Sequence, residues 1–294
     1  MIIANHCHVW PYEYSPERSI KALVKDLIKF HIDGAVVYPP IPPFKDDIKK
    51  YFIDGNQNKW IIQEVKKFDK ILIPWCTIDI NDDPLSEIEE AYSLGCRGFK
   101  MHPQSQGFKP NEEKMFPIYE KIEDIGLPIL FHAGYHGPKP WITLPRYFDE
   151  VAQIFPKLKI IIEHMGMPFY NESVIVAVHR KNVYLGLTRM IRVDSLYKLR
   201  IKEDVGNIRM MILEDGDEIF LPQSVYLDLN KLEDYIKNIG SDKFIWGLDW
   251  PYSRRPDIYI EVINSLQLSY IAKNNILGEN ILKLSGVKRL VAEY

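Results

Sequence analysis

The sequence predicts a (β/α)8 barrel, and two patterns carry that prediction. The first is an alternation of short apolar runs with helical segments from the first residue almost to the last. The second is that four of the apolar runs end in a metal-type ligand, namely Met1–His8, Pro128–His132, Lys159–His164 and Lys243–Asp249. Parallel β/α barrels present functional groups at the carboxyl ends of their strands, so we expect these ligands to converge.

The predicted strands are short apolar runs bounded by proline, glycine or polar residues. Several are apolar over all their central positions, which indicates a parallel sheet covered on its outer face. A closed barrel is favoured over an open sheet because the ligands span the first and last strands, which closure makes neighbours. In chain order the eight runs are Met1–His8, Gly34–Pro40, Ile71–Ile80, Cys96–Pro103, Pro128–Gly134, Lys159–Gly166, Asn182–Thr188 and Lys243–Asp249.

The segments between these strands carry helical signals. From 16 to 31 the apolar residues recur at helical spacing. In a later segment, Pro84 stands near the start and Gly95 follows the end, as is typical of helix termini. In chain order the expected helices are 16–31, 45–68, 84–95, 111–126, 144–155 and 172–180.

One segment breaks this alternation, since about fifty residues separate Thr188 from Asn238. The pair Asp215-Gly216 lies between apolar stretches and predicts a hairpin turn. We interpret 189–225 as an insertion near the barrel mouth, either a lid or substrate-contacting loop, or a decorative or oligomer-forming hairpin. Ser224–Asn230 partly repeats Asn182–Thr188, so either run could be the seventh strand, and we favour the earlier one.

The composition is that of an ordinary soluble globular protein, with 46% hydrophobic and 26% charged residues. A chain of 294 residues suits one barrel domain, which needs about 250 residues. A formal charge of −3 gives no reason to expect nucleic acid or a membrane as partner. The start of the chain lacks the features of a signal peptide, so the cytoplasm is the expected location. We expect a small-molecule substrate as the partner and leave open whether the chain forms a homo-oligomer.

The three cysteines, Cys7, Cys76 and Cys96, show no CxxC spacing, and their odd number argues against a disulfide framework. Each lies in or beside a predicted strand. We therefore expect them to be small buried hydrophobic residues.

The strand-end ligands are four imidazoles and one carboxylate. His6 and His8 are expected to share a face, because strand side chains alternate with period two. A lone strand-end histidine is more often a core or surface residue, and Asp249 before a proline could simply form a turn. Their recurrence at the end where a barrel concentrates chemistry favours a metal site, with zinc as the first expectation.

Six segments in chain order carry a resemblance to a known family: HCHVW, GFKMHPQSQGF, LPILFHAG, IIIEHMG, FIWGLDWPYS and ILGENILKLSG. They resemble the amidohydrolase superfamily, in particular the branch of metal-dependent hydrolases that includes aminocarboxymuconate-semialdehyde decarboxylase. The resemblance implies one divalent metal, usually zinc, held by His6, His8, His132 and Asp249. It also implies that Asp249 accepts a proton from a metal-activated water, and that His164 lies near that water or the substrate and assists proton transfer. Asn5 stands where relatives often carry an acidic residue.

Lys100 and His102 lie toward the end of the fourth predicted strand and share a face by parity. Binuclear relatives use a carbamylated lysine to bridge two metals. In this branch the lysine is not generally a bridge, so a substrate contact or a structural role is predicted for Lys100. The same two roles are open for His102.

Loop residues after the later strands could contact an anionic substrate or line its pocket. Arginine suits bidentate recognition of carboxylates, although any one loop arginine is more often simply solvated. The candidates for substrate binding are Arg189, Arg254, Arg255 and His136, and those for lining the pocket or packing at the rim are Trp10, Trp141 and Trp250.

Three functions are consistent with these residues. The first is hydrolysis of an ester, lactone or amide bond of a small carboxylated molecule. The second is non-oxidative decarboxylation or hydration at the same site, for which relatives often carry an acidic residue shortly after the strand-six histidine. Met165 and Met167 follow His164 here, which favours hydrolysis. A barrel without enzymatic activity is disfavoured, because all the expected ligands are present.

Overall fold

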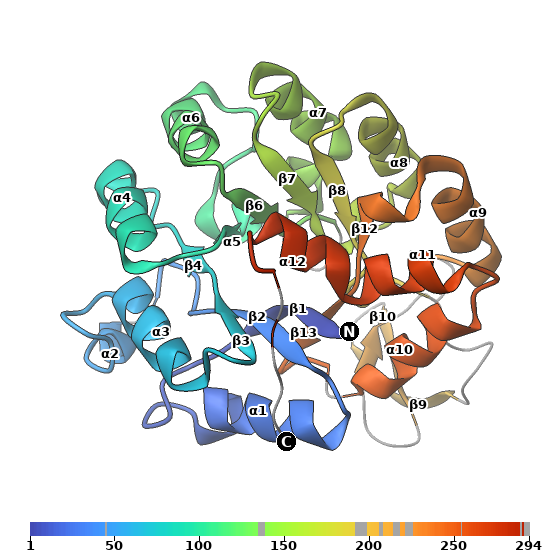
Figure 1. Ribbon diagram of the computed structural model, residues 1–294, viewed down its shortest axis with the longest axis horizontal. Helices are drawn as coiled ribbons and strands as arrows, with labels where there is room; N and C mark the ends of the chain where they lie inside the picture. The colour runs from blue at the N-terminus through green and yellow to red at the C-terminus, as the bar shows by residue number, and fades with distance from the viewer. Residues whose placement is uncertain are drawn as a thin grey trace.

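A closed ring of parallel strands surrounded by helices is the centre of the computed structural model (Figure 1). One run of hydrogen-bonded strands has the order β13-β1-β2-β3, and the other has the order β12-β8-β7-β6-β5-β4. Only Trp75 separates β3 from β4, and only Trp246 separates β12 from β13, so each of these pairs is one interrupted strand. The two runs therefore join at both ends into the predicted (β/α)8 barrel.

The structure describes residues 1–44, 46–134, 139–191, 199–205, 208–213, 218–220, 226–253, 255–288 and 290. The barrel strands are β1 (Ile3–His8), β2 (Gly34–Tyr38), β3 (Leu72–Pro74), β4 (Cys76–Thr77), β5 (Phe99–Met101), β6 (Pro128–Phe131), β7 (Lys159–Ile162), β8 (Val183–Gly186), β12 (Phe244–Ile245) and β13 (Gly247–Trp250). Among the described residues, no helix is both long and apolar enough to cross a membrane.

The helices lie between the strands, and their ends carry local sequence signals. Ser19 accepts a hydrogen bond from the backbone of Ala22 at the start of the first long helix. Asp83 caps the helix that begins at Pro84, and Gly95 ends it with a φ of 109°, a conformation that glycine adopts without strain. The α-helices are α1 (Ile20–Lys29), α2 (Asp46–Lys49), α3 (Gln57–Val65), α4 (Pro84–Leu94), α5 (Pro103–Gln106), α6 (Phe116–Ile125), α7 (Pro145–Ile154), α8 (Tyr170–His179), α9 (Leu229–Ile239), α10 (Pro256–Ser265), α11 (Tyr270–Asn274) and α12 (Asn280–Leu284).

Alternate strand residues divide between two apolar clusters. One set packs against the surrounding helices and includes Ala4, Cys7 and Val37. The other set, with Ile3 and Val36, packs across the barrel and against residues of α12. Figure 1 shows α12 crossing the centre of the barrel, which places the apolar plug at that end and leaves the opposite, carboxyl end for the polar groups. All three cysteines are buried, as predicted.

The insertion forms a small antiparallel sheet of β9 (Leu199–Val205), β10 (Ile208–Leu213) and β11 (Glu218–Phe220). The strands on either side of the predicted turn pair antiparallel, while Asp215-Gly216 itself lies outside the described residues. The favoured seventh strand is confirmed, because β8 pairs with β7 and β12. Residues of the alternative run enter α9 instead.

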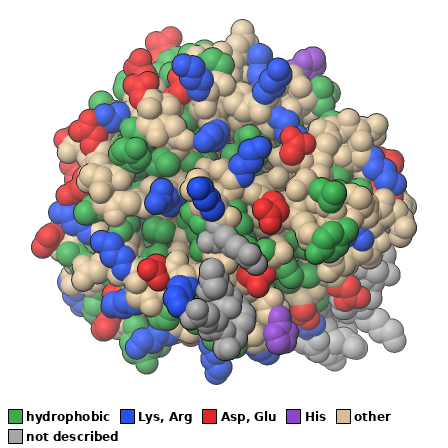
Figure 2. Space-filling model, in the orientation of Figure 1, with side chains coloured by type: hydrophobic (Ala, Val, Ile, Leu, Met, Phe, Trp, Pro, Cys, Tyr) green, Lys and Arg blue, Asp and Glu red, His purple; other side chains and the backbone are tan. Residues whose placement is uncertain are grey.

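Charged side chains of both signs are interspersed over the face of the molecule seen in Figure 2, which is the face that α12 crosses.

Candidate active site

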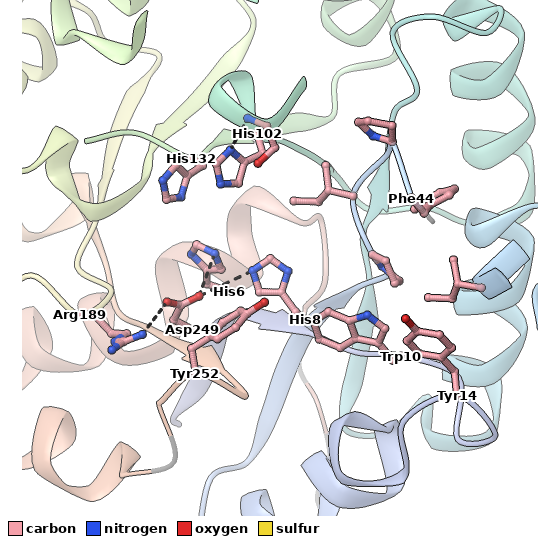
Figure 3. A pocket seen from close by; sticks show the side chains of 15 residues that line it. His6, His8, Trp10, Tyr14, Phe44, His102, His132, Arg189, Asp249 and Tyr252 are labelled. Carbon is pink, nitrogen blue, oxygen red and sulfur yellow. Dashed lines mark hydrogen bonds and ion pairs between the residues drawn. The ribbon is translucent and has the colours of Figure 1, made fainter. Parts of the chain in front are cut away.

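Three potential metal ligands meet at the carboxyl ends of β1 and β13, which are neighbouring parallel strands. One ligand atom each of His6, His8 and Asp249 lies within 4.8 Å of the other two. Asp249 Oδ1 is 3.5 Å from His6 Nε2 and 3.7 Å from His8 Nε2 (Figure 3). Both imidazoles therefore present the same ring nitrogen to one carboxylate oxygen.

An irregularity in β1 turns both histidines toward the inside of the barrel. The register of β1 shifts between Asn5 and Cys7 against β13, and between Ala4 and Cys7 against β2. Strict alternation from Ile3 would place Cys7 inside the barrel, whereas Cys7 packs outward with the helices. The shift therefore directs His8, like His6, toward the site, because a one-residue slip changes the face of every later side chain.

The backbone is held in a left-handed conformation at four residues of the site. The φ angles are 66° at His6, 56° at His164, 49° at Arg189 and 60° at Asp249. Such angles are uncommon outside glycine and cost free energy of order 1–3 kcal/mol each, and they cluster at sites where they aim a side chain.

Glu163 is a fully buried carboxylate that holds this region together. Its Oε2 lies 3.1 Å from His6 Nδ1 and accepts a hydrogen bond from Asn5 Nδ2 at 3.2 Å. Its Oε1 accepts from the backbone amides of His164 and Thr188. A Cβ at Gly186 would lie 2.1 Å from that oxygen, so glycine is required beside it. Because Nδ1 of His6 faces Glu163, its Nε2 is the ring nitrogen that faces Asp249 and would bind a metal.

His164 lies between the three-ligand group and the other imidazoles. Its ring centroid is 5.3 Å from that of His6 and 4.9 Å from that of His132. His164 Nδ1 is 2.7 Å from the carbonyl oxygen of Thr188. A carbonyl only accepts hydrogen bonds, so Nδ1 carries the proton and Nε2 of a neutral His164 is a base.

His132 lies in the same pocket but outside the three-ligand group. Its ring stacks on that of His102, with centroids 3.9 Å apart. His102 Nδ1 accepts a hydrogen bond from the backbone of Ser105 and so caps α5. Burial, with the nearby charge of Lys100 next, lowers the pKa of His102 to about 3. His102 is therefore neutral, with its proton on Nε2.

Lys100 is fully buried beneath the site. Its Nζ lies 3.4 Å from His6 Nε2 and 5.7 Å from the ring centroid of Tyr38. Burial lowers the pKa of Lys100 to about 7, against the opposing attraction of Glu163 and Asp249. Burial also lowers the pKa of His8 well below its ordinary value, with the neighbouring His6 acting in the same direction. A neutral His8 is the form that coordinates a metal.

The cluster opens into a pocket of about 590 Å³, which is within the usual range for ligand sites. Arg189 contributes a cation, and its Nη1 lies 3.4 Å from Asp249 Oδ2 (Figure 3). The ring of Tyr252 meets His8 edge-on, with centroids 5.8 Å apart. The pocket lining consists of His6, His8, Trp10, Tyr14, Pro40, Ile41, Pro43, Phe44, Ile48, His102, Ser105, His132, Arg189, Asp249 and Tyr252.

A sequence model of the amidohydrolase family matches residues 3–286, almost the whole chain. The chain belongs to the amidohydrolase family. This membership confirms the resemblance drawn from the sequence motifs and agrees with the barrel and its cluster of imidazoles and carboxylates.

Three known proteins show how this amidohydrolase relates to others. A dihydroorotase of Helicobacter pylori strain HPAG1 is 26% identical over 184 residues, which cover 57% of this chain and 50% of that protein. The crystal structure of 5-carboxyvanillate decarboxylase from Sphingomonas paucimobilis matches with a TM-score of 0.67 at 13% identity, covering 98% of this chain and 99% of that one. A probable 2-pyrone-4,6-dicarboxylic acid hydrolase from Acinetobacter baumannii matches with a TM-score of 0.61 at 14% identity, covering 97% and 99%. The chain spans about half the length of the dihydroorotase, and the two structural likenesses show the fold alone.

Several residues predicted from the sequence of this amidohydrolase lie away from the pocket lining. Lys100 lies behind His6: its side chain is fully buried, and its Nζ is 3.4 Å from His6 Nε2. Trp250 packs outward and donates from Nε1 to Asp26 at 2.9 Å, and Arg255 pairs with Asp257. Trp141 is 65% exposed and packs against Phe169. His136 and Arg254 lie outside the described residues.

Other residues of this amidohydrolase site went unnoticed in the sequence. The sequence does contain a signal for Glu163, which is its position in an apolar strand run. A carboxylate that is buried in such a run needs polar partners, and these partners indicate a site. Thr188 ends one predicted strand and Tyr252 follows another, but no sequence pattern around either residue indicates a functional role. Tyr38 ends β2, and its ring meets that of His8 edge-on at 4.7 Å.

Proposed function

We propose that this amidohydrolase is a metal-dependent hydrolase that cleaves an ester, lactone or amide bond of a small carboxylated substrate. The observation that carries the proposal is the group formed by His6, His8 and Asp249, whose ligand atoms lie within 4.8 Å at the end of a substrate-sized pocket. His164 stands beside this group, and because its Nδ1 lies 2.7 Å from the carbonyl oxygen of Thr188, Nε2 is the basic nitrogen of the neutral ring.

The donor set fits a divalent metal, with zinc as the first choice. Two imidazole nitrogens are borderline ligands and one carboxylate oxygen is a hard ligand, and zinc accepts both kinds readily. His132, in the same pocket, is the proposed fourth ligand. When bound, such a cation lowers the pKa of a coordinated water and polarises a carbonyl oxygen.

The remaining side chains have proposed roles that follow from their geometry. Asp249, which would also help to hold the metal, would accept the proton that water loses as it attacks the substrate carbonyl, and Nε2 of His164 would relay that proton to the leaving group. Arg189 binds the substrate carboxylate, because its guanidinium is held at the pocket wall beside Asp249. His102 donates from Nε2 to a substrate oxygen.

Hydrolysis is favoured over decarboxylation by the residues after His164. Met165 and Met167 stand where decarboxylase relatives often carry an acidic residue, and a methionine supplies no carboxyl group. Both side chains are buried. Non-oxidative decarboxylation, or hydration of an unsaturated acid, is the alternative. This alternative is supported by the fold that the chain shares with 5-carboxyvanillate decarboxylase, and the reaction would use the same metal site.

A substrate panel tests the reaction class. Lactones, esters and amides are compared with aromatic and muconate-type acids, and both proton release and carbon dioxide release are measured. We expect hydrolysis that disappears in Asp249→Asn and persists in Asp124→Asn, which changes an exposed aspartate of α6. Carbon dioxide release without hydrolysis of any panel member would overturn the hydrolase proposal and leave the fold unaffected.

A further inference from the structure

The pocket has two chemically different ends. Imidazole, carboxylate and guanidinium groups line the end at β1 and β13. The other end is formed by the segments that follow β1 and β2, with Trp10 and Tyr14 from the first and Ile41, Phe44 and Ile48 from the second. Figure 3 shows Phe44, Trp10 and Tyr14 across the pocket from Arg189 and Asp249. A ligand long enough to reach both ends therefore meets polar groups at one and apolar surface at the other.

The apolar end is supported from behind. The ring of Phe44 packs against Phe52 with centroids 5.5 Å apart, and Phe52 packs in turn against Trp60 of α3 at 5.7 Å. Ile48 is only 3% exposed. The ring of Tyr14 meets that of Tyr51 at 5.9 Å. A wall backed in this way is formed before a ligand arrives, so little ordering cost opposes binding.

Trp10, in the segment that follows β1, is held in place by Arg18 and lies close to His8. The backbone amide of Trp10 donates to the carbonyl of Arg18, and the guanidinium of Arg18 lies 5.4 Å from the Trp10 ring centroid. The ring of Trp10 is also 6.1 Å from that of His8. The apolar wall therefore begins directly beside the proposed ligands.

The cationic character of the pocket is limited. Among the lining residues that the structure describes, Arg189 is the one lysine or arginine. Lys100 is fully buried behind His6. One guanidinium matches one carboxylate of a bound substrate.

We propose that the substrate is a monocarboxylate whose non-reacting part is an aromatic or branched apolar group that binds against Trp10, Phe44 and Ile48. The inference rests on the proposed function for the placement of the reacting bond at the histidine end. Each buried methylene then strengthens binding by about fourfold, and an aromatic ring by about tenfold or more.

Binding of stable carboxylates tests this inference without turnover. Calorimetry measures the binding of four carboxylates: acetate, butyrate, phenylacetate and 4-phenylbutyrate. Each is titrated into the protein with Zn²⁺ present and again after Zn²⁺ has been removed with a chelator. We expect 4-phenylbutyrate to bind at least tenfold more tightly than butyrate. Benzoate should bind more tightly than benzene-1,3-dicarboxylate, because Arg189 is the one lysine or arginine among the lining residues that the structure describes.

Variants of the apolar wall locate the preference. Phe44→Ala should reduce the ratio between 4-phenylbutyrate and butyrate by about tenfold, while Phe44→Leu should keep most of it because it retains apolar surface. Leu85→Ala, at an exposed position of α4, is the matched control and should leave the ratio unchanged. Thermal unfolding of each variant shows whether it is folded.

The outcomes distinguish this inference from the proposed function. Equal or undetectable binding of all the carboxylates, or a ratio that Phe44→Ala leaves unchanged, overturns the inference even if esters are hydrolysed. A clear preference for the phenyl compounds supports it, even when no ester, lactone or amide with the same side chains is turned over. A preference for the phenyl compounds without turnover would contradict the hydrolase proposal and leave the inference about the apolar wall standing.

Discussion

Glu163 Oε2 lies 3.1 Å from His6 Nδ1, and both side chains are buried. This contact joins the end of β7 to the end of β1 and fixes which nitrogen of His6 faces Asp249. Asn5 donates to the same oxygen, so the neutral residue at this position supports the carboxylate, whereas an acidic residue would repel it. Carboxylate–histidine pairs of this kind orient metal ligands and raise their basicity.

Replacing Glu163 by glutamine should weaken metal binding by about 10- to 100-fold, because the amide no longer matches every donor around it. Titration of the metal-free protein with Zn²⁺, followed by calorimetry, measures the change. Glu172→Gln, on the exposed face of α8, is the matched control and should bind as the parent does. An unchanged affinity in Glu163→Gln would show that the pair does not tune His6.

The double variant His6→Ala/His8→Ala should lose its metal, because it removes two of the three groups that converge on one point. Elemental analysis of the purified protein measures metal per chain, and one ion is expected in the parent. His31→Ala, which changes an exposed histidine, should keep the parent value. Full retention of metal in the double variant would refute the ligand assignment. Two ions per parent chain would favour a bridging role for Lys100.

Changing His164 to asparagine should reduce turnover by about 10²- to 10⁴-fold while the metal stays bound, because general acid–base groups contribute about that much. Asparagine is chosen because it tolerates the left-handed backbone, with a φ of 56°, better than most residues. Turnover and metal content are measured on the same preparation. Loss of metal as complete as in a ligand variant would make His164 a ligand.

Much of the fold could be predicted because it depends on local signals. Apolar runs, terminal signals such as Pro84 and Gly95, and the breaks at proline identified the eight barrel strands and the helices as far as 180, whereas the helices from α9 onward were not predicted. The convergence of His6, His8 and Asp249 followed from the rule that barrel strands present chemistry at their carboxyl ends.

What the sequence did not reveal depends on contacts between distant strands. Alternation alone brings His6 and His8 together, but the shift in β1 that turns both inward becomes visible only in its pairing with β2 and β13. A substrate contact and a structural role were both open for Lys100, and its burial 3.4 Å from His6 Nε2 depends on β5 and β1 being brought together in the barrel. The partners of Glu163 lie on three different segments of the chain, which no spacing rule connects.

Lys100 should make the stability of the metal-free protein depend on pH. Burial lowers its pKa from 10.5 to about 7 in the folded state. Between these values the unfolded chain binds a proton that the folded chain does not, so stability rises with pH. Below about pH 7 the lysine is charged in both states and the cost of burying that charge is fully present.

The variant Lys100→Met removes this cost and keeps an apolar chain of similar length. We expect it to be more stable than the parent near pH 6, and the difference should shrink by up to about 1.4 kcal/mol per pH unit between pH 7 and pH 10. Urea unfolding in the presence of a chelator, repeated across this range, measures both proteins. Lys25→Met, at an exposed position of α1, is the matched control. Parallel stability curves for Lys100→Met and the parent would mean that Lys100 holds its proton equally in the folded and unfolded states. The lysine would then be a permanent cation beside His6, and its charge would have to be offset by Glu163 and Asp249.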